Sequence, residues 1–182
     1  MRADARRNRE RLLAAADLVF TEGGPEASTE EVARRAGVGV GTVFRHFPTK
    51  ESLLEAVFMA WLSQLAEATD KLSRAEDPGP AFFAFVDTVI EQSARKKVFS
   101  EALADAGVDI VAATAPAKST LRQAGDTLLD RAQRAGVIRP DIDGEELMAV
   151  IVGLSRTAAH LGHDPALRDR AIAILVDGLR AR

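Results

Sequence analysis

The stretch from Ser28 to Lys50, which reads STEEVARRAGVGVGTVFRHFPTK, constrains the fold of this chain more than any other segment. Ser28 and Glu31 have the spacing of a capping box, in which each side chain accepts the backbone N–H of the other residue at a helix start. Gly37 follows where helices commonly end in the left-handed conformation, which glycine adopts without a steric cost. A second short helix is expected over about Val40–Phe47. Two short helices joined by a glycine turn are typical of a DNA-binding helix-turn-helix.

Small and apolar residues at fixed positions are expected to hold these two helices together. Ala33 would let the second helix cross the first closely, and Val43 would fill the space between them. Phe47, one turn after Val43, would face the same side. Pro48 ends the second helix, and Thr49 offers an N-cap to the helix that follows. The spacing therefore predicts a compact helix-turn-helix followed at once by a longer helix.

The segment continues as GVGVGTVFRHFPTKESLLEAV from Gly37 to Val57. This run resembles the signature of TetR-family transcriptional regulators, in which G-x-x-x-x-T-(L/V/I)-(Y/F)-x-(H/Y)-F-x-(S/N/T)-K-(E/D)-x-L-L recurs. The resemblance is dense from Ser28 to Val57. It implies a dimeric, all-helical repressor with an N-terminal DNA-reading head and a C-terminal ligand-binding domain. A later run, AGVIRPDIDGEEL, resembles the SbtR-like subset of C-terminal domains.

Candidate DNA contacts come from this resemblance and from side-chain chemistry. Carried over by position, Thr42, Phe44, His46 and Lys50 match residues that contact phosphates or base edges in relatives. Arg45 can bind guanine O6 and N7 together, and the Thr42 methyl group can contact thymine. The flexible Lys50 side chain can reach a phosphate. The expected DNA-binding residues are Arg6, Arg7, Val40, Gly41, Thr42, Phe44, Arg45, His46 and Lys50.

Three positions depart from the family pattern. Phe44 replaces the usual tyrosine, so a hydroxyl bond to phosphate is lost and apolar contact remains. Gly39 stands where a serine commonly caps the helix, which weakens the cap by a few tenths of a kcal/mol. Val40 stands where a polar reader is common. Two alternatives stay open: Phe44 could pack in the core, and His46 could bond the backbone within the head.

Charge is unevenly distributed along the chain. Up to Arg11 there are five arginines against Asp4 and Glu10, although the whole chain carries a net charge of −3. A basic start on an acidic body fits a protein that contacts phosphates with one end only, and it also fits an ordinary solvated helix. The chain has no cysteine, no apolar run near the ~18 residues of a membrane span and no apolar signal-peptide core. A cytoplasmic protein without a membrane partner is expected.

Hydrophobic periodicity predicts helices along the rest of the chain and no paired strands. The expected fold is all-α, with a three-helix helix-turn-helix DNA-binding domain over residues 1–50 and a helical effector-binding and dimerisation domain over residues 51–182. Residues 107–117 are expected to form an irregular or helical connection. The predicted helices lie at about Ala5–Glu22, Lys50–Ala75, Pro80–Lys97, Phe99–Ala106, Lys118–Ala135, Asp143–Leu161 and from Pro165 onward.

Two groups of apolar residues in this second domain are candidate binding surfaces. The candidate ligand pocket comprises Phe58, Trp61, Phe82, Phe83, Val86, Phe99 and Leu103, although aromatic residues at helical spacing are also typical of a core. The last two helices carry apolar stripes that predict a dimer interface. Its expected residues are Ile151, Leu154, Ala158, Leu161, Leu175 and Leu179.

Other polar clusters do not predict catalysis, and no cofactor is expected. His160, His163 and Asp164 resemble a metal site, but Gly162 is expected to end the helix between the two histidines, so no metal is expected. The pairs Glu30/Glu31 and Glu145/Glu146 stand in first helical turns, where carboxylates complement the helix dipole.

The expected function is therefore that of a DNA-binding transcriptional regulator and not an enzyme. The chain would bind a pseudo-palindromic operator in double-stranded DNA as a homodimer, act as a repressor, and be released by a small, largely apolar effector. A helical adaptor that kept the head without DNA binding is the competing hypothesis, and operator selection separates the two. A helical lyase or hydrolase would need a convergent polar cluster that the sequence does not offer.

Overall fold

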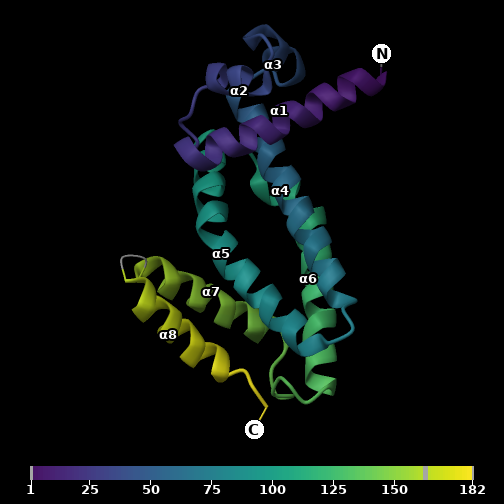
Figure 1. Cartoon of the computed structure of the whole chain (residues 1–182), viewed down its shortest axis with the longest axis vertical. Helices are drawn as coiled ribbons and strands as arrows, with labels where there is room; N and C mark the ends of the chain where they lie inside the picture. The colour runs from purple at the N-terminus through teal and green to yellow at the C-terminus, as the bar shows by residue number, and fades with distance from the viewer. Residues whose placement is uncertain (1, 162–163, 182) are drawn as a thin grey trace. The chain divides into compact units, whose positions relative to one another are not determined.

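A computed structural model of the chain describes residues 2–161 and 164–181. Every regular element in these two ranges is an α-helix (Figure 1), as the sequence predicts. The helices are α1 (Arg2–Gly23), α2 (Thr29–Ala36), α3 (Val40–His46), α4 (Lys50–Ser73), α5 (Pro78–Asp105), α6 (Ile110–Arg134), α7 (Gly144–His160) and α8 (Pro165–Asp177).

Backbone packing divides the chain into two compact units. The first unit comprises Met1–Ser63 and Arg95–Ala115, and the second comprises Gln64–Ala94 and Pro116–Arg182. Helices α4, α5 and α6 each contribute residues to both units. The division predicted from the sequence, into residues 1–50 and 51–182, separates the helix-turn-helix from the rest and stays a prediction.

The core of the first unit is built from the predicted inner faces of its helices. Burial of apolar side chains is the main favourable term in such packing. From α1 the buried residues include Leu12, Ala16, Val19 and Phe20; from α2 and α3, Val32, Ala33, Ala36 and Val43; from α4, Leu53, Leu54, Val57, Phe58 and Trp61. The apolar periodicity read from the sequence is thus the packing face of these helices.

A separate core fills the second unit. Its fully buried side chains include Phe82, Phe85 and Val86 of α5, Leu128 of α6, and Leu147, Ile151 and Leu154 of α7. Arg131 of α6 connects this core to the end of α4 through hydrogen bonds. The Arg131 guanidinium donates to the carbonyl oxygens of Ser73 and Ala75, each at 2.5 Å. These are backbone acceptors that the end of a helix leaves without an intrahelical partner.

Helix α5 corrects one prediction. The sequence pattern predicts a break near Val98, but α5 runs without interruption from Pro78 to Asp105. No glycine or proline lies between Ala81 and Asp105, and Phe99 and Leu103 continue the buried face one turn apart. Nothing in the local sequence therefore ends the helix.

Helix α6 corrects a second prediction, because it begins at Ile110 and not near Lys118. The Asp109 carboxylate accepts the Ala112 backbone N–H at 3.1 Å and caps this start. Pro116 lies inside the helix, where a proline removes one backbone hydrogen bond. The connection predicted as irregular or helical is therefore helical from Ile110 onward.

Side-chain caps form at the starts of α7 and α8, and in part at the start of α2. Asp143 and Glu146 form the complete capping box of α7, and Asp164 caps α8 through the Leu167 N–H at 3.0 Å. At α2 only half of the box forms. The Ser28 hydroxyl accepts from the Glu31 N–H at 3.2 Å, but the Glu31 carboxylate turns to Arg34, so the reciprocal bond predicted from the sequence was wrong.

A half-buried arginine ties α1 to α4 and α5 within the first unit. Arg95 forms an ion pair with Asp17 of α1. Its guanidinium also lies 5.7 Å from the ring centroid of Trp61 and 5.4 Å from that of Phe99. Both distances are in the range of cation–π attraction. Burial lowers the pKa of Arg95 from its ordinary value, and among the described residues Asp17 is its ion-pair partner.

Removal of that carboxylate is expected to destabilise the first unit. Asp17→Asn leaves a cation that is only 23% exposed without its charged partner, at a cost of about 1–2 kcal/mol, below the full penalty for a buried pair because water screens part of it. Urea unfolding followed by Trp61 fluorescence measures the change. Glu10→Gln is the matched control, because its pair with Arg6 is exposed on both sides. Equal effects of the two variants would contradict a special role for Arg95.

Candidate nucleic-acid interface

The corner between α2 and α3 is made by Gly37. Its backbone is left-handed, with φ 68° and ψ 37°, as the sequence predicts. The N–H groups of Gly37 and Val38 donate to the carbonyls of Arg34 at 3.2 Å and Ala33 at 3.0 Å. This is the paired hydrogen bonding of a Schellman motif.

Helix α1 also holds this corner through Arg11. Its guanidinium donates to the carbonyl oxygen of Ala36 at 2.8 Å. Arg35 of α2 also forms an ion pair with Glu22 of α1 at 2.7 Å. Neither role is predictable from the sequence pattern, because each bond joins positions more than ten residues apart.

Helix α3 turns one face inward and the other to solvent. Val43 is fully buried and Phe47, just past the helix, is 3% exposed. Val40 and Phe44, in contrast, are 39% and 42% exposed. Core packing of Phe44, the alternative left open by the sequence, therefore does not occur. Val40 and Phe44 are one turn apart, so the exposed face of α3 carries an apolar strip suited to contact methyl groups and sugars in a groove.

Arg45 is the exposed cation on this face of α3. It makes no hydrogen bond or ion pair with any residue that the structure describes. By contrast, Arg34 on α2 pairs with Glu31 at 2.5 Å. The Arg34 hydrogen bonds hold the pKa of the Glu31 carboxyl below its usual range. Arg45 thus has an unengaged guanidinium, whereas the arginines of α2 are already bound within the head.

The other side chains predicted to contact phosphates are exposed or half-buried. Lys50, at the start of α4, has its Nζ 3.8 Å from the carboxylate of Glu26, whose side chain is 94% exposed. Arg6 is 3.6 Å from Glu10, and both are exposed. Exposed pairs at these distances stabilise little, so a phosphate can replace either carboxylate. Arg7 is exposed on the same helix, and Thr42 is half-buried on α3.

His46 is the last residue of α3, and its side chain is half-buried. Its ring lies 6.4 Å from that of Phe47, and the Arg9 guanidinium lies 5.2 Å above the Phe47 ring. No hydrogen bond from the His46 imidazole to another residue is present in the described part of the chain. Arg9 was not expected from the sequence, because its role depends on α1 passing the end of α3.

The predicted ligand-pocket residues are divided between the two units. Phe58, Trp61, Phe99 and Leu103 belong to the first unit, and Phe82, Phe83 and Val86 to the second. Phe58 stacks on Trp61 at 5.4 Å and on Phe99 at 6.1 Å, and all three are buried. These three aromatic residues are therefore part of the core of the first unit.

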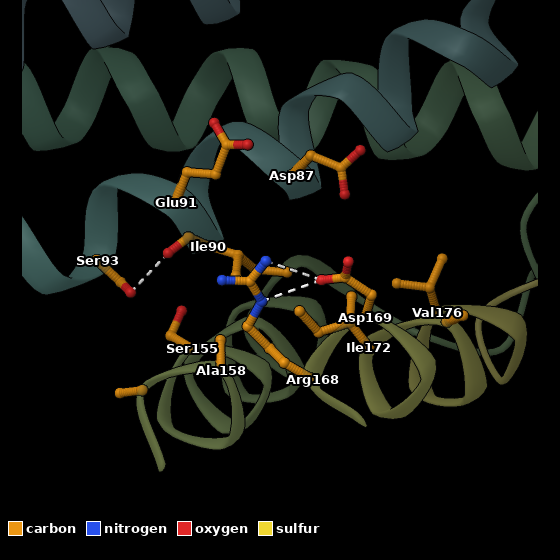
Figure 2. A pocket seen from close by; sticks show the side chains of 12 residues that line it. Asp87, Ile90, Glu91, Ser93, Ser155, Ala158, Arg168, Asp169, Ile172 and Val176 are labelled. Atoms are coloured by element: carbon orange, nitrogen blue, oxygen red, sulfur yellow. Dashed lines mark hydrogen bonds and ion pairs between the residues drawn. The ribbon is translucent and has the colours of Figure 1, made fainter. Parts of the chain in front are cut away.

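A cavity lies instead between α5, α7 and α8 of the second unit (Figure 2). Its volume is about 540 Å³, which is within the range of small-molecule sites. None of the seven predicted pocket residues lines it. Its floor is apolar and its edges carry charged side chains, which the sequence did not reveal because they come from three separate helices.

Most of the residues predicted to form a dimer interface are buried or half-buried within the second unit. Ile151, Leu154 and Leu179 belong to the core of the second unit, and their assignment to a dimer interface stays a prediction. Ala158 lines the cavity, Leu161 is half-buried and Leu175 is 44% exposed. The exposed apolar residues of α7 and α8 are Met148, Val152, Leu167, Ile174 and Leu175.

The remaining sequence candidates add no second site. His163 lies outside the described residues, and no group of three or more potential metal ligands occurs within them. Glu145 and Glu146 stand in the first turn of α7, where Glu146 completes the capping box. No helix in the described ranges is long and apolar enough to cross a membrane.

Gly41 provides a test of the α3 surface. It is exposed, and a Cβ added there would meet nothing within 4 Å. Gly41→Ala is therefore expected to raise the free energy of unfolding by about 0.5–1 kcal/mol, because alanine loses less backbone entropy in a helix. If Gly41 lets DNA approach the backbone, operator affinity falls while stability rises. Gly37→Ala is the contrasting variant, and its positive φ makes a loss of about 1–2 kcal/mol the expected result.

Lys50 provides a test of phosphate contact. Lys50→Ala is expected to reduce the slope of log affinity against log salt by about one, because one counterion fewer is released. Glu26→Gln is the matched control: it removes the carboxylate partner and keeps the cation, so the slope should not fall. Titration of labelled operator at several salt concentrations measures both. An unchanged slope for Lys50→Ala would remove Lys50 from the interface.

Comparisons with known proteins agree with this geometry. Residues 12–57 match the family described as bacterial regulatory proteins of the tetR family, and residues 77–181 match the SbtR-like transcriptional regulator C-terminal domain. A TetR transcription regulatory protein from Mycobacterium vanbaalenii is 36% identical, with 99% of each chain covered and a TM-score of 0.80. The regulator SCO0520 from Streptomyces coelicolor is 32% identical over 95% of this chain and 98% of its own, with a TM-score of 0.76.

A third relative is similar over a shorter stretch of the chain. The HTH-type transcriptional regulator TtgW of Pseudomonas putida is 35% identical over 109 residues, which cover 59% of this chain and 80% of TtgW. These matches are to transcriptional regulators and not to enzymes. The chain therefore belongs to the TetR family of transcriptional regulators, with an N-terminal DNA-binding domain and an SbtR-like C-terminal domain.

Proposed function

We propose that this regulator is a repressor that binds a pseudo-palindromic operator as a homodimer and leaves it when a small, largely apolar effector binds. The observation that carries the proposal is the exposed face of α3, where Val40, Phe44 and Arg45 are turned away from the core. A helix that keeps two large apolar side chains and an unengaged guanidinium in solvent is suited to a groove of DNA.

In this proposal Arg45 reads base identity and Lys50 positions the head. The Arg45 guanidinium would bind guanine O6 and N7, so Arg45→Ala should relax preference at one position of each half-site by about 1–3 kcal/mol. Lys50, with Arg6 and Arg7, would contact phosphates without reading sequence. Phe44 lacks a hydroxyl and would contribute only apolar contact.

The homodimer would form through the exposed apolar residues of α7 and α8. Met148 and Val152 are one turn apart on α7, and Ile174 and Leu175 are adjacent on α8. A two-fold axis would place the same patch of both chains face to face. Two copies of α3 would then read half-sites separated by about one helical turn of DNA or a multiple of it.

Effector binding would act by favouring a state of the dimer in which the two reading heads no longer match that spacing. A ~100-fold loss of operator affinity requires a preference for that state of only about 2.7 kcal/mol. The burial of one or two large apolar groups supplies this amount. Helix α4 follows α3 directly and contributes to both units, which supports it as a mechanical connection.

The adaptor hypothesis is separated from this proposal by operator selection. A randomised DNA pool is incubated with the purified chain, and the bound fraction is sequenced. A repressor enriches a pseudo-palindrome, and binding of that sequence weakens for Arg45→Ala. An adaptor enriches no sequence, and that outcome would refute the proposed DNA readout.

The dimer surface is tested with a matched pair of exposed apolar residues. Ile174 is 72% exposed on α8, and Val111 is 75% exposed on α6 in the first unit. Ile174→Glu is expected to weaken dimerisation by tenfold or more, since it places like charges across the two-fold axis, whereas Val111→Glu should leave it unchanged. Sedimentation at several concentrations measures both, with circular dichroism as the folding control. A dimer that survives Ile174→Glu and dissociates with Val111→Glu would place the interface elsewhere.

A further inference from the structure

The cavity of the second unit has an apolar floor with charged edges. Ile90 of α5, Ala158 of α7, and Ile172 and Val176 of α8 form the floor. Figure 2 shows the Arg168 side chain reaching from α8 toward α5 and Ile90, with the Asp169 carboxylate beside it. An apolar body of small-molecule size can therefore be buried between these helices with its polar end at the edge.

The charges around the cavity do not balance. Asp87, Glu91 and Asp169 contribute three carboxylates against one guanidinium, that of Arg168. Arg168 is already paired with Asp169, at 2.9 Å from Nη2 to Oδ1. Asp87 and Glu91 make no hydrogen bond or ion pair with any residue in the described ranges. They are four residues apart on α5, so they repel each other across one helical turn.

Hydrogen-bonding groups in the cavity point to the same conclusion. The Ser93 hydroxyl donates to the Ile90 carbonyl at 2.7 Å, and the Ser155 hydroxyl donates to the Ile151 carbonyl at 2.9 Å. Each hydroxyl has therefore used its one proton and offers the cavity only acceptor lone pairs. With two carboxylates and two such hydroxyls, acceptors dominate, and a ligand that complements them must be a donor.

A second cluster of carboxylates in the same unit differs from the Asp87–Glu91 pair, because its members are bonded within the chain. Around Arg122, the carboxylates of Asp126 and Glu145 pair with its guanidinium, Asp130 pairs with Arg134, and Asp143 caps α7. All four carboxylates there have partners within the chain. Among the residues that the structure describes, Asp87 and Glu91 have no such partner, and they border the cavity.

We propose that this cavity binds an amphipathic organic cation, with an ammonium or guanidinium group at the Asp87–Glu91 edge and an apolar body over Ile90, Ile172 and Val176. The assignment deepens the effector role and rests on that proposed function. A carboxylate ligand held by Arg168 would have to compete with Asp169 and approach two further carboxylates. The net charge of the edge therefore selects against anions.

Three probes with one apolar body and different head groups test the proposal: phenylbutylamine, phenylbutanol and phenylbutyrate. Their affinities for the full-length protein without DNA are measured by isothermal titration calorimetry. The amine is expected to bind at least tenfold more tightly than the carboxylate, with the alcohol between them. Ala158→Phe, which fills the floor of the cavity, should weaken all three probes.

Variants at the cavity edge identify the residues responsible. Asp87→Asn combined with Glu91→Gln is expected to lower affinity for the amine tenfold or more while affinity for the alcohol stays within about twofold. Both residues are exposed, so the fold should be retained, as circular dichroism will show. Glu67→Gln is the matched control, because Glu67 is an exposed carboxylate of the same unit outside the cavity. It should change no affinity.

The outcomes separate this inference from the proposed function. Tighter binding of phenylbutyrate, or a head-group preference that survives the double variant, would overturn the cation site and favour an anion at Arg168. Failure to bind any probe would also overturn it. If the amine binds as expected but does not alter the salt-dependent affinity for a selected operator, the site is supported and the effector role fails. If no operator is enriched at all, the DNA-binding proposal fails while the calorimetry still decides the site.

Discussion

The burial of Val43 and Phe47 is the constraint on which the reading surface depends. Once Val43 packs inward, helical periodicity turns Arg45 to the far side of α3, while Val40 and Phe44 remain partly exposed. The left-handed Gly37 then sets where α3 begins, and Arg11 holds the end of α2 through a backbone carbonyl. Which residues of α3 are exposed is therefore a consequence of which of its apolar residues pack inward.

Some arginines of this protein bind groups within the chain, and others have guanidinium groups that are exposed to solvent. The number of arginines therefore does not indicate how many can contact DNA. Arg11 and Arg131 satisfy carbonyls at the ends of α2 and α4, and Arg95 lies between aromatic rings with Asp17 as its partner. These guanidinium groups are engaged within the chain because they compensate backbone and carboxylate oxygens that would otherwise be poorly satisfied. The groups left for phosphate or base contact are fewer, and Arg45 is foremost among them.

Helix α7 of the second unit carries apolar residues on more than one face. Ile151 and Leu154 fill the core, Ala158 borders the cavity, and Met148 and Val152 stay in solvent on another face of α7. A helix that is apolar on more than one side is expected where it serves a core and an interface together. In the proposed dimer, the cavity and the two-fold surface would thus share α7 and α8, and a ligand could influence both.

The sequence by itself determined the all-helical class, the turn at Gly37, the inner faces of the first helices and the family resemblance, because all of these depend on residues within a few positions of one another. It placed a break in α5 and began α6 too late. It could not decide which of two apolar faces on α7 is buried, or whether Phe58, Trp61 and Phe99 stack as core. It also could not bring Asp17 to Arg95, or place Asp87 and Glu91 beside a cavity closed by α7 and α8. These features depend on contacts between residues far apart in the chain, and only the tertiary structure fixes which side chains find partners and which remain without them.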